Sequence, residues 1–329
     1  MQVPNIKKRP AMLRWLGIFA LLIVPHVVQA TQWRGNVGAQ SRNKGRQVLA
    51  FLPNEIWIHE GDSIQWTFNV DEPHTLTFLK PGQVRPPFPA GCPGFGFSAS
   101  PASFDGSTCV STAPFMAGQK FEVHFPAGGN FKFVCLIHAN MTGVVHVLPL
   151  QEALPHSQHF YDEQAEDAAE QLLSDVDADH ENEHSHGENQ VIAGTGEVSA
   201  TPGGSNTLSI MRFLNHTTVI HAGQTVEWSN SDPVTAHTIT FGTEPANPIP
   251  PAGKFTKDAD GALHATISSA SDSVHSGFIV AAPQDQIGLP QSPTSTTRLR
   301  ITFTQPGTYP YICALHDTLG MKGTIIVLP

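Results

Sequence analysis

The chain alternates apolar and polar residues in short runs that end at turn-forming residues, a pattern typical of β-strands. In the first half the predicted strands are residues 48–51, 55–59, 63–69, 75–78, 121–125, 130–135 and 143–148. In the second half they are residues 207–213, 217–221, 225–229, 237–241, 298–303, 309–313 and 323–327. Short strands separated by Gly, Pro, Asn and Asp predict an all-β sandwich or barrel in each half.

The two halves repeat each other. The segment HEGDSIQW ending at Trp66 matches HAGQTVEW ending at Trp228, and HTLTF from His74 matches HTITF from His237. A third match pairs FKFVCLIH, residues 131–138, with YPYICALH, residues 309–316. The sequence therefore predicts a tandem duplication, with one domain over residues 45–150 and the other over residues 201–329. Long insertions at residues 80–118 and 242–297 interrupt the strand pattern in both.

The first thirty residues have the features of an export signal. Lys7, Lys8, Arg9 and Arg14 precede an apolar run at residues 15–28, and small residues follow it. We expect residues 1–30 to be removed, leaving a periplasmic or secreted protein with no membrane span. Residues 31–47 are polar and Gly-rich, which predicts a flexible lead-in.

Residues 151–200 are expected to form an acidic, His-rich and mostly disordered linker, with one short helix around residues 163–173. Residues 151–189 contain twelve of the 28 acidic residues of the chain and no Lys or Arg. The formal net charge of the whole chain is −10. Because there is no basic stripe to neutralise phosphates, the sequence does not indicate nucleic-acid binding.

The four cysteines divide into two kinds. Cys135 and Cys313 hold equivalent positions in the repeat, whereas Cys92 and Cys109 occur only in the first insertion. We predict a Cys92–Cys109 disulfide, which an oxidising compartment permits. Cys135 and Cys313 are predicted to remain thiolates held by a metal.

Each half brings together the donors that select copper. A Cys, a His and a Met share one loop near the end of each half, and a second His lies on an upstream strand. Two imidazoles and a thiolate with a weak axial thioether define a blue copper electron-transfer site. Zinc is the competing metal, but structural zinc sites favour more thiolates and usually lack Met. The first predicted set is His74, Cys135, His138 and Met141, and the second is His237, Cys313, His316 and Met321.

These motifs resemble those of the plastocyanin/azurin (cupredoxin) family of type-1 blue copper proteins. The Cys-x2-His-x2-Met spacing of the first loop is similar to the short loop of amicyanin, and the Cys-x2-His-x4-Met spacing of the second is similar to plastocyanin. The resemblance implies two Greek-key β-sandwich domains with one type-1 copper each. It also implies an electron carrier whose partner is a redox protein, such as a c-type cytochrome or a copper enzyme.

Two other functions remain open at this point. Copper storage, delivery or resistance would use the His-rich linker as a collector. A copper oxidase or nitrite reductase needs His residues next to the Cys, but Cys135 lies between Val134 and Leu136, and Cys313 between Ile312 and Ala314. We therefore expect no enzyme activity unless a partner subunit supplies a second type of copper. Electrons are expected to enter through solvent-facing edges of His138 and His316, and the unequal loops predict unequal potentials.

Overall fold

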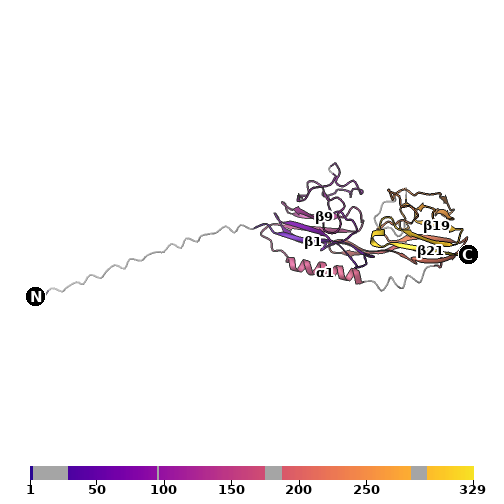
Figure 1. Ribbon diagram of the computed structural model, residues 1–329. Coiled ribbons are helices and arrows are strands. Elements are labelled where there is room, and N and C mark those ends of the chain that lie inside the picture. The colour runs from indigo at the N-terminus through magenta and orange to yellow at the C-terminus, as the bar shows by residue number, and fades with distance from the viewer. Residues whose placement is uncertain (3–28, 95, 175–186, 283–294) are drawn as a thin grey trace.

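The computed structural model describes residues 1–2, 29–94, 96–174, 187–282 and 295–329, which form two β-sandwich domains side by side (Figure 1). The first domain contains β1 (Gln32–Gln40), β2 (Arg46–Leu52), β3 (Glu55–His59), β4 (Ser63–Phe68), β5 (Thr77–Phe78), β6 (Ala102–Ser103), β7 (Val110–Ser111), β8 (Lys120–His124), β9 (Gly129–Val134) and β10 (Thr142–Leu148). After helix α1 (Gln158–Ser174), the second domain contains β11 (Gln190–Thr201), β12 (Gly204–Leu214), β13 (Thr217–His221), β14 (Thr225–Ser231), β15 (Thr240–Phe241), β16 (Thr256–Lys257), β17 (Leu263–Ile267), β18 (Val274–His275), β19 (Arg298–Phe303), β20 (Gly307–Ile312), the 3₁₀ turn η1 (Asp317–Leu319) and β21 (Lys322–Leu328). The predicted all-β architecture of two sandwiches is confirmed.

Both domains follow the same strand order. One sheet of the first domain runs β2-β1-β4-β8-β6, and its counterpart in the second runs β12-β11-β14-β19-β17-β16. The opposite sheets are β3-β10-β9-β5-β7 and β13-β21-β20-β15-β18. Parallel pairs occur at the same places, β1 with β4 and β11 with β14. The duplication seen in the sequence is thus a duplication of topology.

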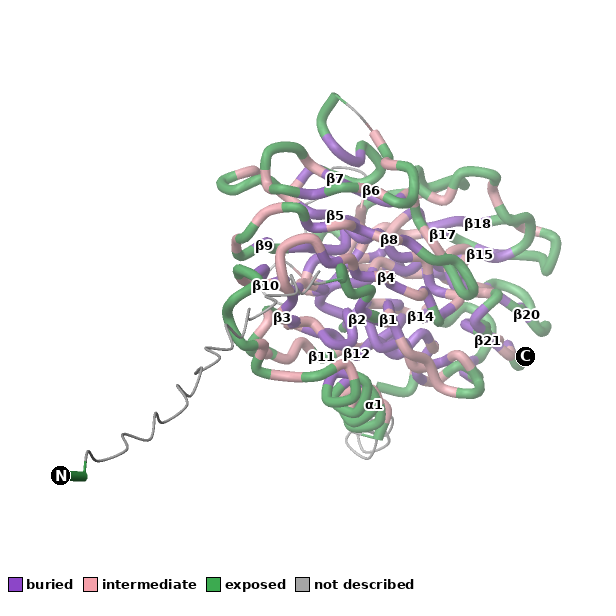
Figure 2. The backbone as a smooth tube through the Cα atoms, turned by 90° about the vertical axis from the view of Figure 1, so that its left-hand side faces the viewer, coloured by how far each residue is buried: buried purple, intermediate pink, exposed green. Residues whose placement is uncertain are grey.

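Each sandwich encloses an aromatic core. Alternate residues of β4 and β14 are buried, as their period-2 pattern predicts. Trp66 and Trp228 lie on these strands and are fully buried, and each packs against an aromatic ring of the opposite sheet, Phe133 at 5.7 Å and Tyr311 at 5.5 Å. Figure 2 shows the buried residues gathered between the layers, with exposed loops and α1 outside. These cores fix the strand ends that carry the metal-binding residues.

The domains join through edge strands, mainly β2 and β12, with a short additional pairing of β10 with β12. Strand β2 pairs antiparallel with β12, with Leu49 opposite Thr207 and Arg46 opposite Ile210. This pairing gives both edges hydrogen-bond partners and makes one continuous sheet across the domains. Because β2 and β12 hold equivalent places in the repeat, the contact resembles the isologous interface of a symmetric dimer.

Helix α1 covers the seam between the domains. Val48 and Leu52 of β2, Leu208 of β12 and Ala165 of α1 belong to one buried cluster. Residues 48–52 are buried without alternation, because one face meets the sandwich core and the other meets α1. The helix expected around residues 163–173 is present and longer, Gln158–Ser174. Its packing shows that this part of the predicted linker is structured, whereas residues 175–186 lie outside the described residues.

Two segments expected to lack structure form strands. Residues 32–40, within the predicted flexible lead-in, form β1, which pairs with β2 and β4. Residues 190–200, placed in the linker by the sequence, belong to β11 and pair with β12 and β14. Backbone pairing on both sides stabilises these strands despite their polar, Gly-rich composition. The predicted export signal falls mainly on residues 3–28, outside the described residues.

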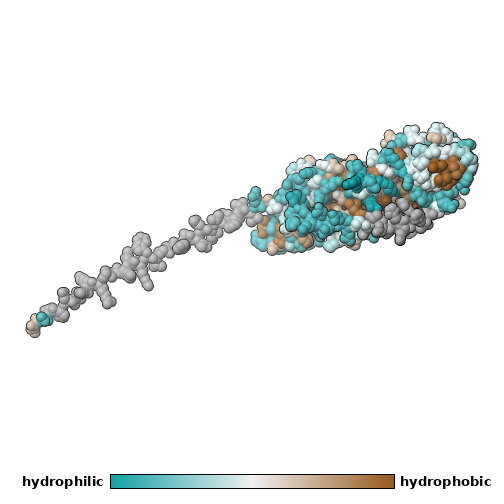
Figure 3. All heavy atoms as spheres, turned by 60° about the horizontal axis from the view of Figure 1, so that its bottom comes forward, coloured by the Kyte–Doolittle hydropathy of each residue, from teal (hydrophilic) through white to brown (hydrophobic). Residues whose placement is uncertain are grey.

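The face shown in Figure 3 carries many hydrophilic residues, and an apolar patch lies at the end of the second domain that is remote from the first. Among the described residues, no helix has the length and apolarity needed to span a bilayer.

Candidate metal centres

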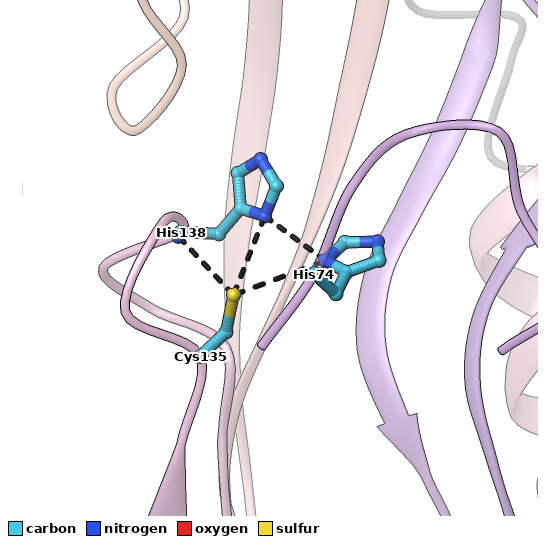
Figure 4. Close-up of side chains that lie close together, drawn as sticks. All are labelled: His74, Cys135 and His138. Atoms are coloured by element: carbon cyan, nitrogen blue, oxygen red, sulfur yellow. Dashed lines mark hydrogen bonds between the residues drawn. The ribbon is translucent and has the colours of Figure 1, made fainter. Parts of the chain in front are cut away.

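The first centre joins a residue before β5 to the loop between β9 and β10. His74 is held by backbone hydrogen bonds with Phe115, and Cys135 directly follows β9. The Nδ1 atoms of His74 and His138 lie 3.9 and 3.7 Å from Cys135 Sγ and 3.0 Å from each other. Figure 4 shows the sulfur and both imidazoles pointing toward one another. Met141 ends the same loop and is fully buried.

The second centre repeats this geometry. The Nδ1 atoms of His237 and His316 lie 4.0 and 3.4 Å from Cys313 Sγ and 3.0 Å apart. Met321 is fully buried at the end of the loop. Among the described residues, the two His/Cys/His sets are the groups of His, Cys, Asp and Glu that could hold a metal ion. The predicted His and Cys residues of each half are therefore brought together.

Both cysteines are poised as thiolates. Burial raises the pKa of the Cys135 thiol, but His138 and His74 outweigh this effect and hold its pKa well below the ordinary value. His316 and His237 do the same for the pKa of Cys313. Backbone N–H groups add to this, since Thr75 N lies 3.4 Å from Cys135 Sγ and the equivalent Thr238 N lies 3.3 Å from Cys313 Sγ.

The upstream histidines pack against β-bulges that contain glycine, and the sequence motifs did not reveal these bulges. Gly38 in β1 and Gly194 in β11 have φ of +74° and +81°, and the strand register shifts at both positions. A Cβ on Gly38 would lie 3.2 Å from His74 Nε2, and one on Gly194 would overlap the His237 imidazole. Each bulge therefore needs glycine for its conformation and its close approach. Both strands lie upstream of the repeated motifs, so the motifs give no sign that either glycine belongs to a site.

Two arginines hold the ligand loops, each in a different way. Arg85, from the first insertion, donates to the carbonyl oxygens of Cys135, His138 and Ala139. Arg212 on β12 plays the equivalent role in the second domain, but from a different position in the fold. It donates to Leu319 O at 2.8 Å in the second loop and to Asn43 O at 2.6 Å in the first domain. Neither arginine was singled out from the sequence, because its partners are backbone carbonyls far away in the chain.

The outer edges of His138 and His316 do not face solvent, which corrects the sequence-based expectation. Their exposed fractions are 2% and 4%, because the domains meet at these edges. Glu72 lies between them, with Oε1 3.2 Å from His138 Nε2 and Oε2 3.6 Å from His316 Nε2. Burial raises the pKa of Glu72, but the two histidines outweigh it and hold that pKa below its ordinary value.

The same contacts shift the histidines. Burial lowers the pKa of His138, but Cys135 and Glu72 outweigh it and raise that pKa to about 9. Cys313 and Glu72 likewise outweigh burial and raise the pKa of His316 to about 10. In the metal-free protein both rings are therefore protonated at neutral pH. Metal binding must displace the proton at Nδ1.

The donor sets fit copper. For an ion held in one plane by two nitrogens and a sulfur at about 2.0 and 2.3 Å, these atoms would be roughly 3.5 to 3.7 Å apart. The Nδ1–Sγ separations of 3.4–4.0 Å bracket the expected nitrogen–sulfur value, and the two Nδ1–Nδ1 separations of 3.0 Å lie about 0.5 Å below the expected nitrogen–nitrogen value. Moreover, Nε2 of His74 and His237 is buried without a hydrogen-bond partner, so the hydrogen-bonded contacts of these rings lie on the Nδ1 side, toward the cysteine. A buried thiolate with two imidazoles and a nearby Met suits copper.

The remaining cysteines behave as predicted. Cys92 and Cys109 form a disulfide in the first insertion. Cys135 and Cys313 are free and buried.

Comparisons with known proteins agree with this picture. The family described as copper binding proteins, plastocyanin/azurin family, matches residues 38–148 and 201–328. No curated protein sequence matches the chain.

Similar solved structures include a plastocyanin, an amicyanin and a purple cupredoxin. Plastocyanin from Dryopteris crassirhizoma is 17% identical, covering 42% of this chain and 99% of that one, with a TM-score of 0.21. Amicyanin from Paracoccus versutus is 17% identical, covering 38% and 86%, with a TM-score of 0.24. A purple cupredoxin from Nitrosopumilus maritimus is 19% identical, covering 42% and 98%, with a TM-score of 0.20.

Proposed function

Because this chain belongs to the copper-binding plastocyanin/azurin family, we propose that it is an exported electron-transfer protein with two type-1 copper sites. The proposed ligands are His74, Cys135, His138 and Met141 in the first domain and His237, Cys313, His316 and Met321 in the second. The observation that carries the proposal is the duplicated, buried His/Cys/His set. Copper bound there would supply one-electron chemistry by cycling between Cu(I) and Cu(II).

The protein's own residues would keep each site rigid and dry. The ligand side chains are buried, so water is excluded from the donor atoms. Thr75 and Thr238 donate backbone hydrogen bonds to the thiolates, and hydrogen bonding around the sulfur tunes the redox potential of such sites. Arg85 and Arg212 fix the loop carbonyls. A fixed donor set means that little has to move when an electron arrives or leaves.

Export and a basic partner are part of the proposal. The Cys92–Cys109 disulfide supports an oxidising compartment, the periplasm or the exterior. Helix α1 turns Glu163, Glu166 and Glu170 outward, and these carboxylates would attract a positively charged redox protein such as a c-type cytochrome. Added salt should weaken that attraction.

The visible spectrum of the copper-loaded protein tests the proposal. We expect an intense thiolate-to-Cu(II) band, and Cys135→Ser and Cys313→Ser should each remove about half of it. A loaded protein without this band would refute the type-1 assignment. If one of these variants retained the full band, the domain that carries the substitution would not contain a type-1 copper site.

Copper counting separates electron transfer from storage. We expect two copper ions per chain at equilibrium. Additional ions lost on deletion of residues 175–186, which contain His180, His184 and His186, would favour storage or delivery.

A further inference from the structure

Glu72 is a buried carboxylate placed between the two metal centres. It lies two residues before His74, and only 4% of it is exposed. Each of its oxygens faces a different domain, Oε1 toward His138 and Oε2 toward His316. In both rings the contact is made by Nε2, the nitrogen on the far side from Nδ1 and the cysteine. A continuous chain of close contacts therefore runs from one centre to the other.

Within the described part of the chain, the buried charge of Glu72 is paired with these two rings. A buried carboxylate is costly unless it is paired and hydrogen-bonded. Among the described residues, the ion pairs of Glu72 are those with His138 and His316. The neighbouring Asp71 points elsewhere and pairs with Lys44 at 2.9 Å. Glu72 is therefore placed to act on the two centres.

The bridge is not duplicated. The residue two positions before His237 is Thr235, whose hydroxyl lies 3.1 Å from Ser209 Oγ. The repeat thus supplies two metal centres but one carboxylate between them. A residue that served only its own domain would be expected in both copies, or would contact one histidine.

We propose that Glu72 is a positioning residue shared by both centres, which joins them into one two-centre unit that exchanges electrons through His138, Glu72 and His316. This inference rests on the proposed function. In each exchange one electron passes from the reduced centre to the oxidised centre. The former is oxidised by one electron and the latter is reduced by one electron. No bond is made or broken, and the Nε2 protons stay on the rings. The buried histidine edges are thus a route between centres, in place of an entry from solvent.

The first test asks whether Glu72 acts on the other domain. Cys135→Ser leaves the second centre alone, and Cys313→Ser leaves the first. Adding Glu72→Gln to each should lower its Cu(II) affinity by roughly tenfold, the lower end of what loss of an outer contact to a ligand costs. Asp71→Asn, which removes a charge one residue away, should leave both affinities unchanged. An effect on the first centre alone, or equal effects of Asp71→Asn, would overturn the sharing.

The second test measures the exchange itself. After pulse reduction of the fully oxidised protein, re-equilibration between centres should slow several-fold in Glu72→Ala, where the side chain between the rings is gone. An unchanged rate would overturn the route. Circular dichroism and the retained blue band would show that the variant is folded and that both centres are filled.

A metal-free measurement separates this inference from the proposed function. In the ¹⁵N spectrum of the metal-free protein, Glu72→Gln should shift Nε2 of both His138 and His316, and Asp71→Asn should shift neither. If the wild type lacked a blue band but both nitrogens shifted, the proposed function would fail and the shared contact would stand. If the band were present but only His138 shifted, the sharing would fail alone.

Discussion

The two domains share a metal centre but differ in how that centre is held. In both, a glycine bulge backs the upstream histidine, and a threonine N–H faces the thiolate. What is not repeated lies around these parts: Arg85 on one loop, Arg212 on the other, and a single Glu72. The repeated features therefore belong to the chemistry of one centre. Of the unrepeated ones, Arg212 and Glu72 join the two copies, whereas Arg85 holds the ligand loop of its own domain.

Helix α1 is the largest element that the repeat does not duplicate, and loss of its contacts with the core should have the largest effect on stability. Tyr161 is 1% exposed, packs against Trp33 at 5.8 Å and accepts a hydrogen bond from Trp57 N. Tyr161→Ala should lower the free energy of unfolding by about 3–5 kcal/mol, the usual cost of deleting a buried aromatic side chain. Denaturant unfolding of the metal-free protein measures this. Phe160→Ala, at an exposed neighbour, is the control, and equal effects of both variants would contradict the packing role of α1.

The glycine bulges test whether the two copies tolerate the same change. Gly38→Ala and Gly194→Ala should each cost roughly 1–2 kcal/mol for the positive φ alone. The added methyl of Gly38→Ala would meet mainly Val70, 2.6 Å away, whereas that of Gly194→Ala would overlap His237. We therefore expect Gly194→Ala to cause a greater loss of copper from the second centre than Gly38→Ala causes from the first. Copper titration followed at the blue band of each centre measures both losses.

Two controls separate strain from contact in that comparison. Gly61 and Gly223 also have positive φ, but a Cβ at either would meet nothing within 4 Å. Alanine at these positions should reproduce the strain without loss of copper. If Gly223→Ala removed copper as effectively as Gly194→Ala, the contact with His237 would not be the cause.

The parts of the molecule that the sequence predicted are those encoded by local motifs. The donor residues follow from motifs that recur in the two halves, and the Cys92–Cys109 disulfide follows from the two cysteines that the repeat leaves unmatched. The structure of residues 32–40 and 190–200 was missed because partner strands, not their own composition, make them strands. The unbroken apolar run at residues 48–52 is a sign in the sequence of a second covered face. The place of Glu72 had no such sign, since it depends on how two domains meet.

The ligand loops give a comparison of redox potentials. The first loop has two residues between His138 and Met141, and the second has four, including η1 and Gly320 with φ of +93°. Because the axial ligand and the surroundings of the sulfur tune such sites, the two midpoint potentials should differ. A redox titration followed at the blue band should show two steps. A single step with equal potentials in Cys135→Ser and Cys313→Ser would contradict this expectation.

The smallest expected difference concerns a cross-strand pair on the outer sheets. In the second domain Arg300 lies opposite Glu227 and also pairs with Asp258 and Asp260. The first domain has Gln65 opposite Glu122 at this place and lacks the ion pair. Arg300 holds the pKa of Asp260 at about 2, below its ordinary value of 3.8. Since the folded pKa is the lower one, the stabilisation is present above pH 3.8 and is lost as the pH falls through about 2.

Arg300→Gln tests this sign. The pairs are partly exposed to solvent, so the loss of stability at pH 6 should be small and should shrink further in high salt. Thermal melting of the metal-free variant and of the wild type should differ at pH 6 and converge toward pH 2. Glu122→Gln is the matched change in the first domain, where there is no arginine partner to lose, and it should leave the melting temperature at pH 6 unchanged or slightly raised. If Glu122→Gln lowered the melting temperature more than Arg300→Gln did, the expected difference between these two cross-strand pairs would be wrong.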